Sequence, residues 1–102
     1  MPVRKLVRDK IPEILAREGK KFRIVAYLKG EQLLEELTKK LREEVEEFVN
    51  SKNLEELADI LEVVDALSQC LGSSFEKVLE LKKKKQLERG GFKDGIVIEL
   101  YE

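Results

Sequence analysis

Carboxylates are crowded into residues 43–59, which read EEVEEFVNSKNLEELAD. Two pairs keep the spacing that places side chains on neighbouring turns of a helix: Glu44 with Glu47, and Glu56 with Asp59. Four carboxylates converging between two helices would repel one another strongly unless a cation lay among them. Oxygen ligands suit a hard divalent cation such as Mg²⁺, with Mn²⁺ as the alternative. The spacing therefore suggests an oxygen-only metal site formed by these four residues.

Helical geometry separates the acids that face inward from those that face solvent. Glu44 lies about 60° from the centre of the apolar arc of its helix, and Glu47 borders the same side. Glu43 points away from that arc, where solvated acids belong. In the next helix, Glu56 projects inside the apolar arc and Asp59 lies at its edge.

A purely structural interpretation of the same acids is also open. Asn53 followed by Glu56 fits a capping box, in which the glutamate side chain bonds back to the start of the helix. The remaining acids would then be ordinary solvated helix faces. Glu44 has no such role, because it lies in mid-helix and points inward. The two interpretations differ in whether the carboxylates meet.

The elements that would hold these acids are mainly helical. Apolar residues recur at helical spacing over about residues 31–48 and again over 53–72, and a third long helix is predicted from Ser73 to Gly90. A short helix is expected within RDKIPEILAREGK. Extended segments are expected near residues 22–28, as a short strand or an extended connector, and near residues 96–101, as a strand. The prediction is a single mainly α-helical domain over residues 1–102, a helical bundle with a central antiparallel helix hairpin.

Composition excludes several classes of protein. The 102 residues contain no histidine, which removes imidazole-based zinc sites and catalytic triads. The 20 basic and 21 acidic residues nearly cancel, which argues against a nucleic-acid binder. The lone cysteine, Cys70, permits no internal disulfide, and no apolar run is long enough for a signal peptide or membrane span. A cytoplasmic protein is therefore expected.

Association of several copies is also expected. A domain of about 100 residues buries only about two thirds of the surface of its unfolded chain. The apolar arcs of the predicted helices are broader than one hairpin can cover. The sequence therefore predicts a homodimer or homotetramer.

The third long helix carries a candidate phosphate-binding surface. Its apolar stripe begins with Phe75 and Val78 and continues, without changing direction, into Lys82, Lys85 and Arg89. Cations on one face could bind a polyanion. The alternative is that cations favour a helix C-terminus, where their aliphatic stems lie over apolar surface.

The N-terminal segment offers a second basic group, made of Lys5, Arg8 and Lys10. These three residues are candidates for binding substrate phosphates. The alternative for Arg8 is an ion pair with Asp9 in a surface cap.

Together, "KLREEVEEF" and "EELADIL" resemble the E-x-x-E … E-x-x-D signature of the MazG-like all-α nucleotide pyrophosphohydrolases, relatives of phosphoribosyl-ATP pyrophosphatase. The signature falls on Glu44 with Glu47 and on Glu56 with Asp59. The opening "KLVRDKIPEIL" and the late "ERGGF" are similar to a small-protein branch of that superfamily. Eight residues separate Glu47 from Glu56, fewer than in typical members, so the pairs face each other only if whole turns are missing from both helices.

The resemblance implies a Mg²⁺-dependent hydrolase that splits nucleoside triphosphates between the α and β phosphates, giving a monophosphate and pyrophosphate. Glu44 or Glu47 is then expected to be the general base, while Glu56 and Asp59 mainly hold metal. Removal of surplus or non-standard nucleotides is the expected purpose. Two alternatives are hydrolysis of phosphoribosyl-ATP and a catalytically silent helical module for dimerisation or regulation.

Overall fold

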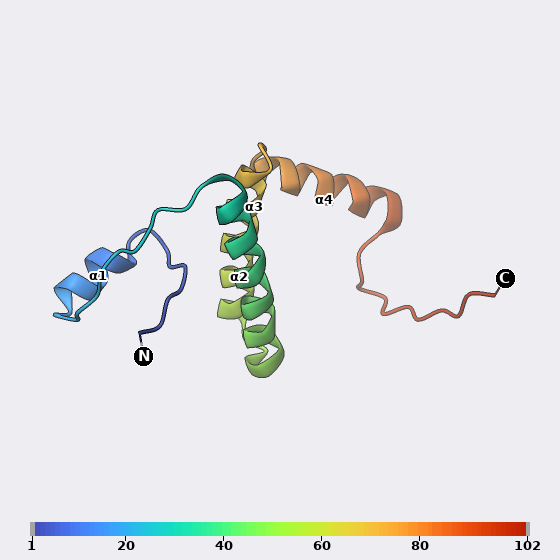
Figure 1. Cartoon of the computed structure of the whole chain (residues 1–102). Coiled ribbons are helices and arrows are strands. Elements are labelled where there is room, and N and C mark those ends of the chain that lie inside the picture. The colour runs from blue at the N-terminus through green and yellow to red at the C-terminus, as the bar shows by residue number, and fades with distance from the viewer. Residues whose placement is uncertain (1, 102) are drawn as a thin grey trace.

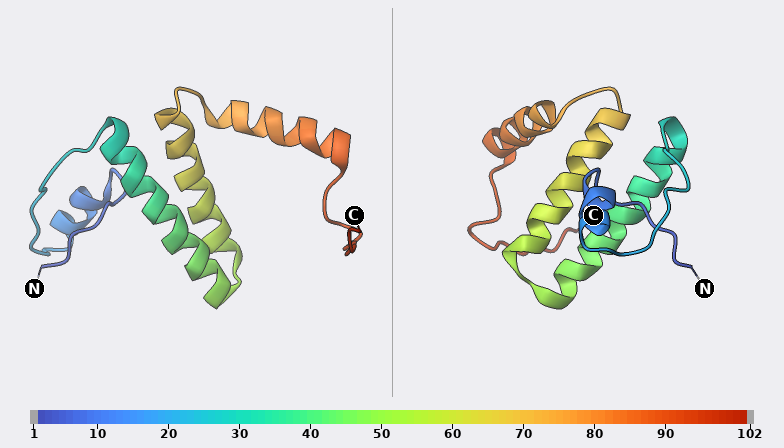
Figure 2. Two further views of the ribbon diagram at one scale, coloured as in Figure 1. Left: turned by 45° about the vertical axis from the view of Figure 1, so that its right-hand side comes forward. Right: turned by 90° about the vertical axis from the view of Figure 1, so that its left-hand side faces the viewer.

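The computed structural model describes residues 2–101 and contains four helices and no strand within that range. The helices are α1 (Ile11–Arg17), α2 (Gly30–Ser51), α3 (Leu54–Cys70) and α4 (Phe75–Arg89). Helices α2 and α3 form an antiparallel hairpin, with α1 on one side and α4 projecting from the other (Figures 1 and 2). The prediction of a mainly helical chain with a central hairpin is therefore confirmed. Met1 and Glu102, the ends of the predicted domain, lie outside the described residues.

The hairpin is closed by a tight turn between α2 and α3. Lys52 ends α2 with its backbone in the left-handed region, at φ 56°, and its N–H donates to the Phe48 carbonyl over 2.7 Å. Asn53 then caps α3, because its Oδ1 accepts a hydrogen bond from the Glu56 N–H over 3.1 Å. The facing sides of the two helices bury Leu37 and Val63. Two residues of turn are therefore enough to reverse the chain and bring both helices into contact.

The turn from α3 to α4 fixes the direction in which α4 leaves. Gly72 has φ 76° and donates its N–H to the Gln69 carbonyl over 3.0 Å, while Ser73 donates to the Ser68 carbonyl over 2.9 Å. This pair of bonds is a Schellman motif, which satisfies the last carbonyls of α3. Ser74 then caps α4 by accepting from the Lys77 N–H, one residue later than the predicted start at Ser73. Hydrogen bonds therefore hold both sides of the turn.

The two predicted extended segments contain no regular secondary structure. Residues 21–29 form the connector between α1 and α2, one of the two forms expected for 22–28. The prediction of a strand near residues 96–101 is wrong. No other part of residues 2–101 lies beside this segment to supply the hydrogen bonds of a sheet. Ile96 and Val97 are 78% and 93% exposed. A β-rich sequence therefore stays extended and unpaired here.

No helix among residues 2–101 combines the length and apolar character needed to cross a membrane.

The positive φ of Gly72 in the α3–α4 turn leads to a testable prediction. Gly72→Ala should lower the free energy of unfolding by about 1 kcal/mol, because a Cβ is unfavourable at positive φ. Gly91→Ala is the matched control: it has open space around it and no positive φ, so it should be neutral or slightly stabilising. Urea unfolding of both variants at one protein concentration measures the difference. Equal effects would show that Gly72 does not require its left-handed conformation.

Candidate metal centre

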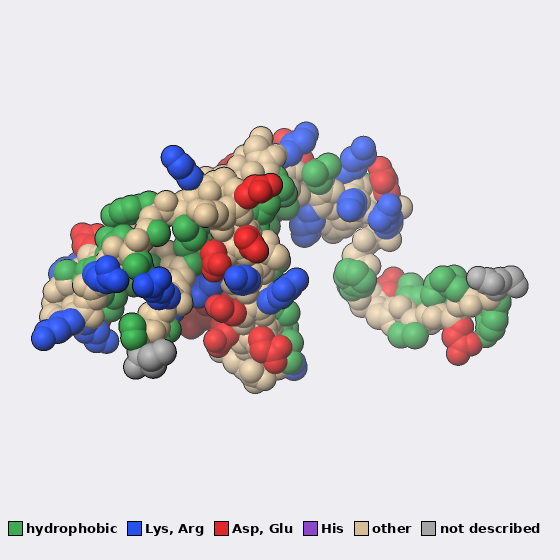
Figure 3. Space-filling model, in the orientation of Figure 1, with side chains coloured by type: hydrophobic (Ala, Val, Ile, Leu, Met, Phe, Trp, Pro, Cys, Tyr) green, Lys and Arg blue, Asp and Glu red, His purple; other side chains and the backbone are tan. Residues whose placement is uncertain are grey.

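Three of the four predicted carboxylates meet between α2 and α3. One side-chain oxygen each from Glu44, Glu56 and Asp59 lie within 4.8 Å of one another, and all three residues are partly buried. Glu44 comes from α2, and the other two come from the first turns of α3. The short connection after Glu47 therefore does not prevent the two helices from presenting these acids to each other. Figure 3 shows acidic side chains gathered along the hairpin.

The Glu56 carboxylate belongs to this cluster and is not a returning cap. Asn53 accepts a hydrogen bond from the Glu56 backbone, but within residues 2–101 no bond runs from the Glu56 side chain back to the Asn53 N–H. Only half of a capping box is therefore present. The purely structural interpretation of Glu56 does not describe its side chain.

Glu47 is exposed and lies outside the set of three oxygens. It still acts on the cluster through its charge. Partial desolvation raises the pKa of the Glu56 carboxyl above its ordinary value, and the negative charge of Glu47 raises it further. Smaller contributions of the same sign come from Asp59, Glu44 and Glu55. The cluster therefore holds its negative charge at a cost in free energy, and any nearby cation would relieve it.

Two cations of the chain already lie against the cluster. The Arg8 guanidinium contacts Asp59 over 2.6 Å, and the Lys40 ammonium lies 3.7 Å from Glu44. The N-terminal segment thus crosses to α3, and the proposed pair of Arg8 with Asp9 is not the one that forms. Lys40 was not among the sequence candidates, although its position four residues before Glu44 was a usable signal.

The acids of this group outnumber its cations. Glu44, Glu47, Glu56 and Asp59 are four carboxylates, whereas Arg8 pairs with Asp59 and Lys40 is shared between Glu44 at 3.7 Å and Glu43 at 3.5 Å. An excess of negative charge therefore remains, which a divalent cation would offset.

The donor set fits a hard cation in chemistry. All three clustered ligands are carboxylate oxygens, which Mg²⁺ prefers. In an octahedral Mg²⁺ site at most one pair of three ligands lies on opposite sides of the ion, about 4.2 Å apart, and the other pairs lie about 3.0 Å apart. Glu44, Glu56 and Asp59 would therefore hold such an ion only after their oxygens, now within 4.8 Å of one another, move closer together.

The other predicted basic residues do not reach this cluster. Lys5 and Lys10 are exposed on the N-terminal segment. Lys82, Lys85 and Arg89 share one face of α4, as predicted, and line a groove there. Because α4 projects away from the hairpin, that groove lies far from the carboxylates of the same chain (Figure 1). Of the predicted phosphate ligands, Arg8 is the one that the fold brings to the acids.

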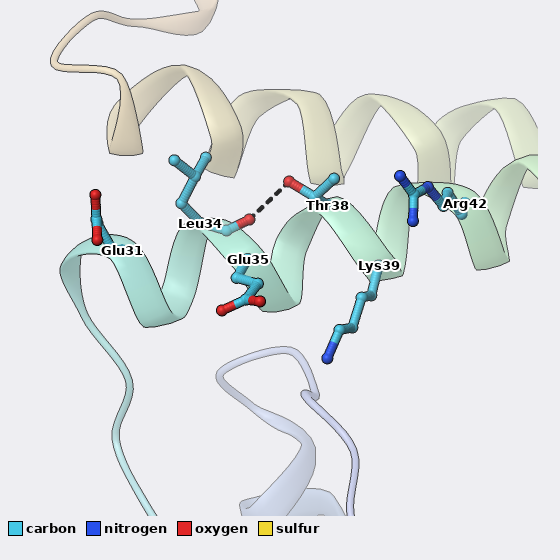
Figure 4. Close-up of a pocket in the computed structure, with 6 residues that line it drawn as sticks. All are labelled: Glu31, Leu34, Glu35, Thr38, Lys39 and Arg42. Atoms are coloured by element: carbon cyan, nitrogen blue, oxygen red, sulfur yellow. Dashed lines mark hydrogen bonds between the residues drawn. The ribbon is translucent and has the colours of Figure 1, made fainter.

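A second depression lies along α2 and does not coincide with the acid cluster. Its lining includes Glu31, Thr38 and Arg42 (Figure 4). The Thr38 hydroxyl is already used, since it donates to the Leu34 carbonyl over 2.8 Å. The lining residues all belong to one helix, so the surface is open and gathers no set of ligands. The carboxylate cluster is the better candidate for chemistry.

Comparison of the chain with family models, with curated protein sequences and with solved structures found no match. The assignment of chemistry therefore depends on the residues of this chain and their geometry.

The raised pKa of Glu56 predicts a pH-dependent stability in metal-free buffer. Between its ordinary pKa of about 4.5 and its raised folded value, the folded state binds more protons than the unfolded state. Stability should therefore fall as pH rises through this window. Glu56→Gln should remove that component and leave the variant more thermostable than the wild type at neutral pH. Thermal unfolding at a series of pH values, with chelator present, measures both effects.

Glu62→Gln is the matched control, because Glu62 is exposed on α3 and lies outside the set of three oxygens. Its pH profile should follow that of the wild type. A Glu56→Gln variant that is less stable than the wild type at neutral pH would contradict the repulsion described above.

Proposed function

We propose that this chain is a Mg²⁺-dependent nucleotide pyrophosphohydrolase. It cleaves nucleoside triphosphates between the α and β phosphates and releases a nucleoside monophosphate and pyrophosphate. The observation that carries the proposal is the convergence of Glu44, Glu56 and Asp59 oxygens within 4.8 Å. These residues also fall on the E-x-x-E … E-x-x-D pattern, so motif and geometry support the same site.

The chain's own residues divide the work as follows. Glu44, Glu56 and Asp59 would hold the cation, which would offset phosphate charge and help orient water. Glu47, exposed beside the cluster, would accept a proton from the attacking water as general base. The water oxygen would bond to the α phosphorus while the bond from that phosphorus to the α–β bridging oxygen breaks, and the electron pair would leave with pyrophosphate. Arg8, already at Asp59, binds the phosphates through its guanidinium.

Glu47 is the better choice of base because it is free of the ligand set. The sequence left Glu44 and Glu47 equivalent, but the Glu44 oxygen lies with those of Glu56 and Asp59. A carboxylate bound to a cation is a weak proton acceptor. The geometry therefore supports Glu44 as a ligand and Glu47 as the base.

A second candidate function is a silent helical module for dimerisation or regulation. The observation that favours it is the extensive apolar surface that the chain leaves exposed, including Leu57 and Leu61 on α3. In a silent module the clustered acids would only destabilise the fold. Stability without turnover would therefore be its signature.

The first test is a panel of standard and modified nucleoside triphosphates, and phosphoribosyl-ATP, incubated with the protein and Mg²⁺. The hydrolase should release pyrophosphate rather than orthophosphate, and chelation by EDTA should abolish the release. The most active nucleotide identifies the substrate class. No release from any nucleotide would favour the silent module.

Neutralising the ligands should separate catalysis from folding. We expect Glu44→Gln and Asp59→Asn each to lower turnover by at least 100-fold, because the cation loses a charged ligand. Helical circular dichroism should stay unchanged, since both residues lie on helices that pack through other side chains. Glu62→Gln, exposed on the same helix as Asp59, should keep wild-type turnover. Retained turnover in both ligand variants would remove this site.

Cation binding should also be visible without any substrate. A ligand that binds only the folded state stabilises it by about 2.7 kcal/mol at a concentration of 100 times its dissociation constant. Mg²⁺ or Mn²⁺ should therefore raise the melting temperature of the wild type. Asp59→Asn should lose most of this rise, whereas Glu62→Gln should keep it. Equal rises in both variants would place the cation elsewhere.

A further inference from the structure

One chain exposes far more surface than its mass requires. Its accessible surface is 9763 Å², whereas a compact monomer of 11.8 kDa exposes about 5,900 Å². Its radius of gyration is 17.8 Å, against about 13 Å for a compact domain of this length. The excess of about 3,900 Å² exceeds the roughly 800 Å² per partner that a stable interface needs. The chain therefore has ample surface for a partner of its own size.

Part of this excess is an apolar surface on α2. Val45 and Val49 are 44% and 49% exposed. At 100° per residue they lie about 80° and 120° around α2 from buried Leu37, while Glu44 lies about 20° and Glu47 about 80° in the opposite direction. The exposed valines therefore lie on the other side of Leu37 from these two acids.

Helix α3 repeats this arrangement. Leu57 and Leu61 are 41% and 52% exposed. They lie about 120° and 160° around α3 from buried Val63 in one direction, and Asp59 lies about 40° in the other. Because α2 and α3 are antiparallel, rotations in the same sense bring both apolar pairs to the same side of the hairpin. We call this surface, formed by Val45, Val49, Leu57 and Leu61, the apolar face.

Helix α4 carries a complementary surface. Its groove has apolar lining from Val78, Leu81 and Phe92, and cationic lining that includes Lys85 and Arg89. Within residues 2–101 neither cation forms an ion pair. The hairpin is rich in exposed carboxylates such as Glu46, which lies next to the apolar face. An apolar centre with opposite charges at its edge is the pattern of a protein–protein contact.

The α3–α4 turn prevents α4 from reaching the apolar face of its own chain. The Schellman bonds of Gly72 and Ser73, followed at once by the Ser74 cap, set the direction of α4. Folding α4 back would break these bonds. Figure 2 shows α4 leaving the hairpin at its end and not lying along it. Both surfaces are therefore left uncovered within residues 2–101 and are open to another chain.

We propose that two copies of this chain exchange α4: the α4 groove of each docks on the apolar face of the other. This contact is isologous, since each copy gives and receives the same surface. Leu81 and Val78 meet the exposed valines and leucines of the hairpin, and Lys85 and Arg89 meet its exposed carboxylates. The contact is independent of the proposed catalytic function, because it uses the side of the hairpin opposite the acid cluster.

Sedimentation equilibrium over a concentration series tests the contact. The wild type should have twice the 11.8 kDa mass of one chain. Leu61→Asp on the apolar face and Leu81→Asp in the groove should each weaken the dimer by at least tenfold, because each buries a charge in an apolar contact. Leu87→Asp is the matched control. Leu87 is 89% exposed and lies about 160° around α4 from Lys85, so this variant should stay dimeric.

Mixing the two disruptive variants tests the exchange itself. A pair made of one Leu61→Asp chain and one Leu81→Asp chain keeps one contact intact, since an unaltered groove meets an unaltered apolar face. The mixture should therefore dimerise more tightly than either variant alone, and this recovery also shows that both variants are folded.

Three results would overturn the proposal. A wild type that is monomeric at all concentrations has no such contact. A Leu81→Asp chain that stays dimeric beside a monomeric Leu61→Asp chain would mean that hairpins pair with hairpins. A mixture no tighter than its components would exclude exchange of α4.

Discussion

Leu37 and Val63 are the only apolar side chains buried among residues 2–101, and they lie on the facing sides of α2 and α3. This one helix–helix contact carries the fold of the single chain. Helices α1 and α4 project from the hairpin on opposite sides, and the N-terminal segment contacts α3 through the Arg8–Asp59 ion pair. Because the contact is so small, whatever lies at its edge has a large effect on stability. The acid cluster lies at that edge.

The same packing that buries Leu37 forces the carboxylates together. Helix pairing brings Glu44 to within reach of Glu56 and Asp59, and the pKa of Glu56 is raised first by its partial desolvation and then by repulsion from Glu47 and the neighbouring acids. A fold selected for stability alone would place apolar or oppositely charged side chains here. Arg8 and Lys40 relieve part of the repulsion, and because Lys40 also pairs with Glu43 an excess of negative charge remains. Stored repulsion of this kind is typical of sites that bind a charged ligand.

Local signals in the sequence predicted the helices well. Periodic apolar residues located α2 and α3, and the Asn53 cap and Gly72 marked boundaries that the structure confirms. Helical spacing also predicted that Glu44, Glu56 and Asp59 would face the neighbouring helix. These features depend on residues a few positions apart, where the geometry of a helix is fixed.

Features that depend on distant residues were not accessible in this way. Arg8 and Asp59 are 51 positions apart and no periodic pattern links them. Their ion pair could therefore be found only from the folded structure. The strand expected near residues 96–101 failed for a related reason, since a strand forms only where a second one lies beside it. The direction of α4 depends on hydrogen bonds of a turn and not on the helix itself. Local sequence propensity therefore predicted the helices but not the contacts that they make with distant parts of the chain.

The positions of α1 and α4 on opposite sides of the hairpin have a consequence for function (Figure 1). In the dimer proposed above, the second copy would cover Leu57 and Leu61 and leave Glu44 and Asp59 open. Association and cation binding would then stabilise the same two helices through different faces. Because residues in separate contacts contribute almost additively, a partner that stabilises the hairpin would offset the destabilising effect of the acids. On this argument the proposed dimer would allow so small a hairpin to keep a charged site.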